Sequence, residues 1–192
     1  VLAAAAAFGF LTARDGNRVG ALLAGPDGPT VIAPRSGRSA VLALLHRLDQ
    51  RGRAKPGAVA LDDALRRTRL AARRRGLVVV IGDLMDDGPW PRELRALAGR
   101  HEVVVAEVRD PREAELPSVG LLTLVDPETG RRLEVQTDNP KLRARFAEAA
   151  ANQQAARARS VVASGASHLV LSTDRDWMLD VVRFVAGRRR RR

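Results

Sequence analysis

The sequence predicts an α/β protein in which a mostly parallel sheet lies between two layers of helices. Two observations favour this class. Short apolar runs of strand length alternate with longer segments of helical periodicity, as in chains built from successive strand–helix units. The runs at Leu77–Ile81 and within HEVVVAEV are apolar without a break over several residues, which is typical of strands covered on both faces. A chain of 192 residues fits one such domain, which we expect over residues 1–187.

The first part of the chain predicts a helix followed by a hairpin. Val1–Arg14 has helical character and is ended by the turn pair DG. Arg18–Ala24 and Thr30–Pro34 then read as two strands joined across the turn GPDGP. We expect these strands to pair antiparallel, with Thr30–Pro34 at the edge of the sheet.

The remaining strands and helices alternate. Leu77–Ile81, Val103–Val108 and Leu169–Ser172 are predicted to share one sheet with Arg18–Ala24. Apolar residues at helical spacing predict helices after Ser39, from Leu61 and from about Pro91.

The last third of the chain adds a second hairpin and two helices. Leu121–Val125 and Arg132–Gln136 alternate around the turn DPETG, which predicts an inserted or edge hairpin. The pair NP at residues 139–140 supplies a cap and a first-turn proline for a helix reaching about Ala163. A final helix is expected to end before Gly187, and Arg188–Arg192 to form a basic tail.

Composition excludes several kinds of chemistry. The chain has no cysteine, which rules out disulfides, thiolate metal ligands and cysteine nucleophiles. His46, His101 and His168 are far apart and form no HxxxH ligand pair. The net charge is +11, but arginine is spread along the whole chain and aromatic residues make up only 3%. Nonspecific binding of nucleic acid or of anionic membranes through basic residues is therefore an alternative that rests on charge alone.

One arrangement has the form of a site. The strand Leu77–Ile81 runs directly into Gly82 and Asp83, and Asp86 and Asp87 follow in a short loop before the next helix. Open α/β sheets place ligands and metals just outside the carboxyl ends of their strands. The three carboxylates are therefore candidate Mg²⁺ ligands for a phosphoryl-transfer or hydrolytic enzyme. Loop acids in such places are also commonly solvated or cap a helix, and we expect Asp86 and Asp87 either to remain hydrated or to cap the helix near Pro91.

A succession of segments resembles a known bacterial family. The segments are DGNRVGALL, GAVALDDAL, RRRGLVVVIGDLMD, RHEVVVAEVRDPREAELPSVG and LVDPETG. Together they are similar to the domain of unknown function 58 family, whose core resembles a von Willebrand factor A domain. The run from His101 to Gly130 is the most discriminating part, and the resemblance covers nearly the whole chain.

The resemblance implies a degenerate metal site. Metal-binding von Willebrand A-type domains use an Asp-x-Ser-x-Ser motif after the first strand, a threonine in a later loop and an aspartate after the fourth strand. Asp83 corresponds to that last aspartate, while Val59 stands where the threonine would be. The first motif and its strand would precede Val1. We therefore expect Asp83 to be vestigial, with no cofactor and with Mg²⁺ bound only if the upstream motif exists.

The missing first strand has a structural consequence. In the von Willebrand A arrangement it lies between the strands at Arg18–Ala24 and Leu77–Ile81. We expect either a gap at that place or an unusual direct pairing of the two strands.

The resemblance also implies a function without catalysis. Similar proteins act beside MoxR-type AAA+ ATPases as assembly or adaptor proteins, often tethered by amino-terminal membrane helices. We expect a protein partner, with a MoxR-type AAA+ ATPase as the candidate, no specific nucleic acid and a place at the cytoplasmic face. The opening stretch VLAAAAAFGFL is only about half the ~20 residues of a membrane span. Membrane contact is thus expected through a segment absent from this chain, or weakly through Arg188–Arg192.

Overall fold

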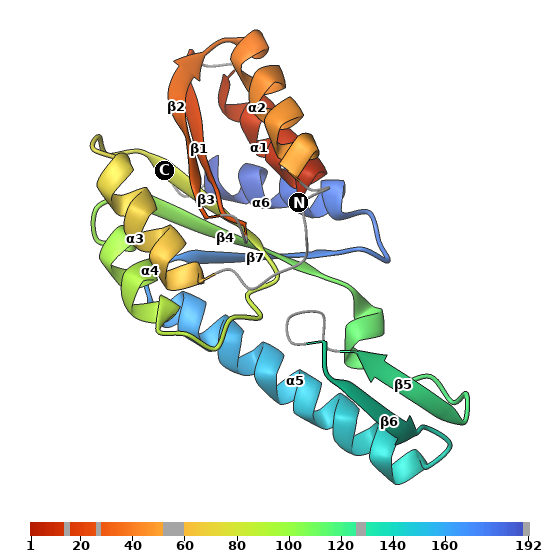
Figure 1. Ribbon diagram of the computed structural model, residues 1–192. Helices are drawn as coiled ribbons and strands as arrows, with labels where there is room; N and C mark the ends of the chain where they lie inside the picture. The colour runs from red at the N-terminus through yellow and green to blue at the C-terminus, as the bar shows by residue number, and fades with distance from the viewer. Residues whose placement is uncertain (14–15, 26–27, 52–59, 126–129, 190–192) are drawn as a thin grey trace.

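A parallel three-stranded sheet forms the centre of the fold. The structure is a computed structural model and describes residues 1–13, 16–25, 28–51, 60–125 and 130–189. The central strands are β3 (Leu77–Gly82), β4 (Glu102–Arg109) and β7 (Ser167–Ser172), all parallel and in the order β3-β4-β7. The helices are α1 (Leu2–Ala13), α2 (Arg38–Arg51), α3 (Leu61–Ala71), α4 (Trp90–Ala98), α5 (Pro140–Ala163) and α6 (Trp177–Arg189). Figure 1 shows α3, α4 and α5 on one side of this sheet and α1 and α6 on the other.

The apolar run of β4 explains why it lies at the centre. Alternate residues of a strand point to opposite faces, so Val103 and Val105 pack with α3, α4 and α5, while Val104 and Ala106 pack with α1 and α6. Residues 103–107 are all buried. Burying each valine contributes about 1.5–3 kcal/mol relative to leaving it exposed. The predicted α/β class with helices on both faces of a parallel sheet is confirmed.

The amino-terminal hairpin forms a sheet of its own. β1 (Arg18–Leu23) pairs antiparallel with β2 (Thr30–Ser36), as predicted, with an irregular register between Val19 and Ala21. Gly20 lies at this bulge, where a Cβ atom would come within 2.8 Å of the Ile32 carbonyl oxygen. The prediction that β1 shares a sheet with β3, β4 and β7 is wrong, because β1 has no ladder with them.

The separation of β1 from β3 leaves β3 at an edge of its sheet. Of the two expected outcomes, a gap or a direct pairing, the structure has the unpaired one. The strand LVVVIG is apolar throughout, yet its residues are only half-buried or exposed, in contrast to the buried run of β4. Such an edge presents backbone N–H and C=O groups that await a partner strand.

The second hairpin lies beside the first half of α5. β5 (Leu121–Val125) and β6 (Arg132–Gln136) pair antiparallel as predicted, after the short 3₁₀ helix η1 (Pro111–Ala114). The Asn139 side chain accepts hydrogen bonds from the backbone N–H groups of Lys141 and Leu142, which confirms it as the cap of α5. Figure 1 shows this hairpin projecting past the carboxyl end of the central sheet.

The last helix does not stop before Gly187 but continues to Arg189. Within the residues that the structure describes, no helix is both long and apolar enough to cross a membrane.

Candidate functional site

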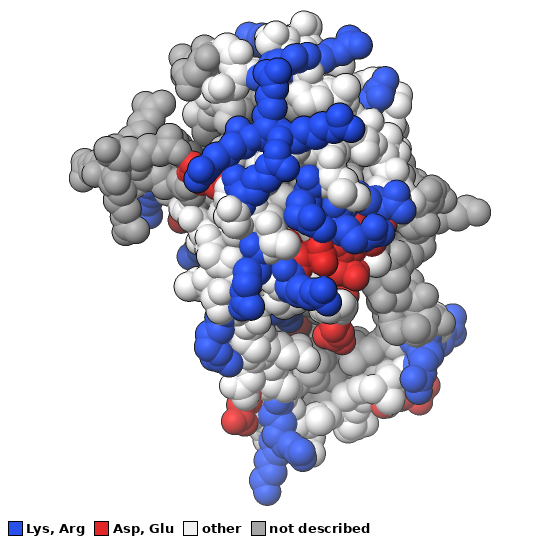
Figure 2. All heavy atoms as spheres, turned by 90° about the vertical axis from the view of Figure 1, so that its left-hand side faces the viewer, with Lys and Arg blue, Asp and Glu red and all other residues white. Residues whose placement is uncertain are grey.

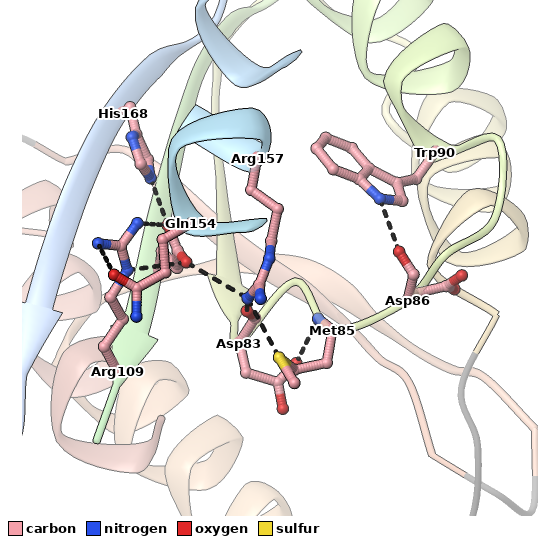
Figure 3. Close-up of polar contacts among 9 residues, drawn as sticks. Asp83, Met85, Asp86, Trp90, Arg109, Gln154, Arg157 and His168 are labelled. Carbon is pink, nitrogen blue, oxygen red and sulfur yellow. Dashed lines mark hydrogen bonds and ion pairs between the residues drawn. The ribbon is translucent and has the colours of Figure 1, made fainter. Parts of the chain in front are cut away.

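Polar side chains converge beside the ends of β3 and β4, where His168 reaches them from the start of β7. Glu107 and Arg109 come from the end of β4, His168 from β7, and Arg157 from α5. Figure 3 shows them together with the loop that follows β3, which carries Asp83. This carboxyl edge is the place where open α/β sheets commonly bind ligands.

Glu107 is the centre of the cluster. Its side chain is fully buried, and it accepts two hydrogen bonds from Arg109, from Nε at 2.9 Å and from Nη2 at 2.8 Å. The Nε2 atom of His168 lies 2.7 Å from Glu107 Oε2, and the Gln154 Oε1 atom lies 3.4 Å from Arg109 Nη1. A fork-to-fork pair of this kind satisfies both carboxylate oxygens with charge-assisted hydrogen bonds.

These contacts keep Glu107 ionised. Burial alone would raise its pKa, but the hydrogen bonds from His168 and Arg109 and their positive charges outweigh burial and hold the pKa below its usual value. A buried carboxylate without such partners would instead take up a proton. The cluster is therefore a buried charge with its partners in place.

Arg157 connects this cluster to the loop after β3. Its Nη1 atom lies 3.8 Å from Glu107 Oε1, and it donates to the Asp83 carbonyl oxygen at 3.4 Å. The same atom lies 3.1 Å from the sulfur of Met85. Only 18% of the Arg157 side chain is exposed, and its guanidinium reaches from α5 to the loop (Figure 3).

The loop itself has a constrained backbone. Leu84 has a φ of 57°, a left-handed conformation that a residue other than glycine rarely adopts. Its side chain is buried in the core beside α3 and α4, which holds that conformation. With Leu84 directed inward, Asp83 and Met85 on either side of it are both exposed. The Asp83 carboxylate accepts the backbone N–H of Met85 at 3.1 Å.

Asp86 is used to hold structure. One of its oxygens accepts the N–H of Leu61 at 2.6 Å, and the other accepts the N–H of Gly88 at 2.5 Å. The indole of Trp90 donates to the Asp86 carbonyl oxygen at 2.9 Å. Leu61 is the first residue of α3, so Asp86 acts as the missing side-chain cap of that helix.

Of the two expected roles for Asp86 and Asp87, hydration or capping of the helix near Pro91, capping is therefore wrong for both residues. α4 begins at Trp90 with no side-chain hydrogen bond at its cap position, Pro89. Asp86 caps α3 instead, and Asp87 is exposed. The physical reason is geometric, because the loop folds back toward the start of α3 before α4 begins.

The acids predicted as metal ligands are not gathered into a ligand set. Among the residues that the structure describes, no group of three or more histidine, aspartate or glutamate side chains could hold a metal ion. Asp83, Asp86 and Asp87 share one loop, but Asp86 already has both oxygens occupied by backbone N–H groups. Val59, which the resemblance places at the threonine position, lies outside the described residues.

Sequence reasoning missed the Glu107 cluster. The segment HEVVVAEV reads as an apolar run, and Glu107, which follows four apolar residues within it, is the one signal that could have drawn notice. A glutamate at a position buried on both faces requires partners, which here come from 61 residues away in His168 and from 50 residues away in Arg157.

The fold and this edge define a class: an α/β protein whose polar site lies at the carboxyl ends of parallel strands. The chain belongs to the family described as "Protein of unknown function DUF58", whose model matches residues 1–156. The predicted family membership is thereby confirmed.

Similar proteins come from mycobacteria. The chain is 47% identical over 194 aligned residues to the uncharacterized protein Rv1480 of Mycobacterium tuberculosis, covering 98% of this chain and 60% of that protein. The uncharacterized protein Mb1516 of Mycobacterium bovis matches to the same extent. The uncharacterized protein MAV169 of Mycobacterium avium is 46% identical over 166 residues, covering 84% of this chain and 95% of that protein.

The chain spans about 60% of the length of the first two of these relatives. No solved structure matches the chain.

Proposed function

We propose that this chain is a non-enzymatic protein-interaction module that works with a MoxR-type AAA+ ATPase in the assembly or maturation of a complex. The observation that carries the proposal is the loop of residues 83–88. Its buried and polar groups hold the loop in one shape, while Met85 is left 57% exposed between the exposed acids Asp83 and Asp87. We call these three exposed residues the recognition loop.

A loop held in this way suits binding. Arg157 fixes the Asp83 carbonyl, Asp86 fixes the turn at Gly88, and Leu84 anchors the loop in the core. A surface ordered before its partner arrives loses less conformational entropy on binding. An exposed methionine adapts to irregular apolar surfaces and is common at protein interfaces.

The same contacts favour binding over catalysis. Asp86 accepts two backbone hydrogen bonds, and Glu107 is fully buried and paired with Arg109 and His168. Carboxylates committed to such structural bonds are poor general bases, because proton transfer would break the contacts that position them. The Mg²⁺-dependent enzyme using Asp83, Asp86 and Asp87 is therefore the weaker alternative.

A von Willebrand A-like arrangement is part of the proposal. In it the space between β1 and β3 is the place of a central strand, and Asp83 is the remnant of a metal ligand. The unpaired apolar edge of β3 supports this view, because a strand of that composition suits burial between two neighbours. We further propose that the protein works at the cytoplasmic face, tethered through a segment outside this chain.

Direct binding to a purified MoxR-type AAA+ ATPase tests the proposal. The chain would be titrated against the ATPase by calorimetry, with and without ATP. Met85→Ala should weaken the affinity about fivefold or more, because truncating a residue that dominates an interface costs over about 1 kcal/mol. Asp83→Asn should weaken it by a smaller factor.

Leu70→Ala is the matched control. Leu70 is 60% exposed, much like Met85, but lies on α3 away from the recognition loop. It should leave the affinity for the ATPase unchanged. Equal affinities for all four proteins, or an absence of binding in both nucleotide conditions, contradicts the proposed role of the recognition loop.

A further inference from the structure

The opposite edge of the central sheet carries a concentration of arginine. Arg73, Arg74 and Arg75 lie in the loop that enters β3, Arg95 lies on α4 and Arg100 in the loop that enters β4. All five are exposed. We call this surface the arginine edge. Figure 2 faces the side of the molecule where the parallel strands begin, and lysine and arginine gather across it around a small acidic area.

Hydrogen bonds join the loops that carry most of these arginines. The Arg100 guanidinium donates to the Arg73 carbonyl oxygen, and Arg95 donates to the Ala163 carbonyl oxygen at 3.5 Å. The backbone N–H of Glu102 donates to the Gly76 carbonyl oxygen at 3.0 Å. The two loops are thus joined, and the arginine edge is a single surface formed by α3, α4 and the loops after them.

The arginines of this surface differ in their ion pairs from those on α3. The neighbouring arginines on α3 have acidic partners: Arg66 and Arg67 pair with Asp63, and Arg69 lies 3.8 Å from Glu93. Within the described part of the chain, no acidic side chain forms an ion pair with any of the five arginines of the arginine edge. Uncompensated guanidinium groups attract anions and bind phosphate in a bidentate manner.

Exposed leucines flank the arginine triplet. Leu70 on α3 is 60% exposed and Leu77 at the start of β3 is 44% exposed. The sequence between them, arginines included, forms the tip of this edge. A surface that combines cationic groups with protruding apolar side chains matches an interface of anionic headgroups over hydrocarbon.

We propose that the arginine edge docks on an anionic lipid surface. Lipid phosphates would pair with Arg73, Arg74 and Arg75, while Leu70 and Leu77 enter the headgroup layer. Nucleic acid fits less well, because the arginine edge has no aromatic residue on which bases could stack and its leucines would gain nothing. A planar lipid surface also needs no groove, and these arginines stand on loops and helices rather than lining one.

β7 runs parallel to β4, and α6 returns across the sheet from the end of β7 (Figure 1). α6 therefore ends, at Arg189, on the side where the strands begin. This proposal concerns the edge opposite the recognition loop and does not depend on the ATPase.

Vesicle flotation tests the proposal. The purified chain would be mixed with vesicles of phosphatidylcholine and phosphatidylglycerol, or of phosphatidylcholine alone, at low and at raised salt. We expect binding to the anionic vesicles only. Replacing Arg73, Arg74 and Arg75 together by glutamine should lower the partition coefficient about a hundredfold, at about fivefold for each basic residue lost.

A control variant removes the same charge elsewhere. Arg112, Lys141 and Arg145 are exposed on η1 and on the first half of α5, and their replacement by glutamine removes three positive charges away from the arginine edge. This variant should lose far less binding than the triplet variant, and Leu70→Ser should also weaken binding. Equal losses in both charge variants, or tight binding of duplex or single-stranded DNA with no preference for anionic vesicles, would overturn the proposal.

Discussion

The two edges of the central sheet handle charge in opposite ways. At the carboxyl edge Glu107 is buried, and its partners Arg109 and His168 are only 23% and 11% exposed in their side chains. At the amino edge the arginines are exposed and lack acidic partners within the described chain. The first arrangement fixes the shape of a loop, whereas the second leaves charge available to an external anion. This difference is the basis for assigning protein recognition to one edge and anion binding to the other.

One strand carries this contrast from end to end. β4 is preceded by His101, which is buried at 4% exposure, and contains Glu107 near its other end. Burial lowers the pKa of His101, and the charges of Arg100 and Arg75 lower it further, against a hydrogen bond with the backbone of Ala72. The amino end of β4 thus holds a buried neutral group and the carboxyl end a buried charged one.

Removing the Glu107 carboxylate at the carboxyl end of β4 should have the largest effect on the free energy of unfolding. We expect Glu107→Ala to lower the free energy of unfolding by about 3–5 kcal/mol, because two guanidinium groups lose a buried partner. Urea unfolding followed by circular dichroism measures this change. Glu148→Ala, at an exposed position of α5, should stay within about 0.5 kcal/mol of the parent chain. A loss below about 1 kcal/mol for Glu107→Ala would mean that the network does not stabilise this edge.

Asp86→Ala should produce the next largest effect. It removes two hydrogen bonds, to the N–H groups of Leu61 and Gly88, and with them the side-chain cap of α3. We expect a loss of about 1–2 kcal/mol in urea unfolding, as for other cap residues. Asp87→Ala is the matched control, since Asp87 is exposed in the same loop. Equal effects of the two substitutions would contradict the structural role given to Asp86.

The pH dependence of stability should separate the two ends of β4. The folded pKa of His101 is lowered, so its contribution is complete above the unfolded value of 6.5 and is lost as the pH falls below that value. The folded pKa of Glu107 is also lowered, so its contribution is lost only below its unfolded value of 4.5. One group can change stability by at most about 1.4 kcal/mol per pH unit.

Substitution of His101 tests whether this residue causes the loss of stability at the higher of the two pH ranges. His101→Gln should flatten the decline in stability just below pH 6.5 that urea unfolding detects in the parent chain. His46→Gln, at an exposed position of α2, should leave that decline in place. If both variants keep the decline, another group is responsible for it.

Local sequence patterns predicted most elements but not all of their neighbours. The antiparallel pairing of β1 with β2 and the Asn139 cap follow from a few adjacent residues, and both predictions are confirmed. The predicted placement of β1 in the central sheet is wrong. An apolar pattern indicates that a strand is buried, but it does not indicate which strand pairs with it. The Leu61 partner of Asp86 is likewise 25 residues away, beyond the reach of local capping rules.

The sequence predicts where the candidate site lies but not which residues form it. Asp83 lies at the carboxyl edge as its position after an apolar strand indicates, yet the groups that order this edge are Glu107 and Arg157. Their contact joins β4 to α5 and depends on how the long helix crosses the sheet. No periodicity in either segment predicts that crossing.

The smallest expected effect is that of Mg²⁺ on the carboxyl edge, and it tests whether the contrast between the edges includes a metal. Mg²⁺ binds tightly only when several protein oxygens converge in octahedral geometry, because it gives up its waters reluctantly. Asp83 offers an exposed carboxylate that also accepts the N–H of Met85, while the Asp86 oxygens are engaged by Leu61 and Gly88. The Arg157 guanidinium contacts this loop and would repel a second cation. We therefore expect calorimetric titration of Mg²⁺ and Mn²⁺ to show no saturable binding in the micromolar range, with Asp83→Ala indistinguishable from the parent chain. Saturable binding that disappears in Asp83→Ala would contradict the vestigial role of Asp83 and would restore a metal-dependent role to this edge.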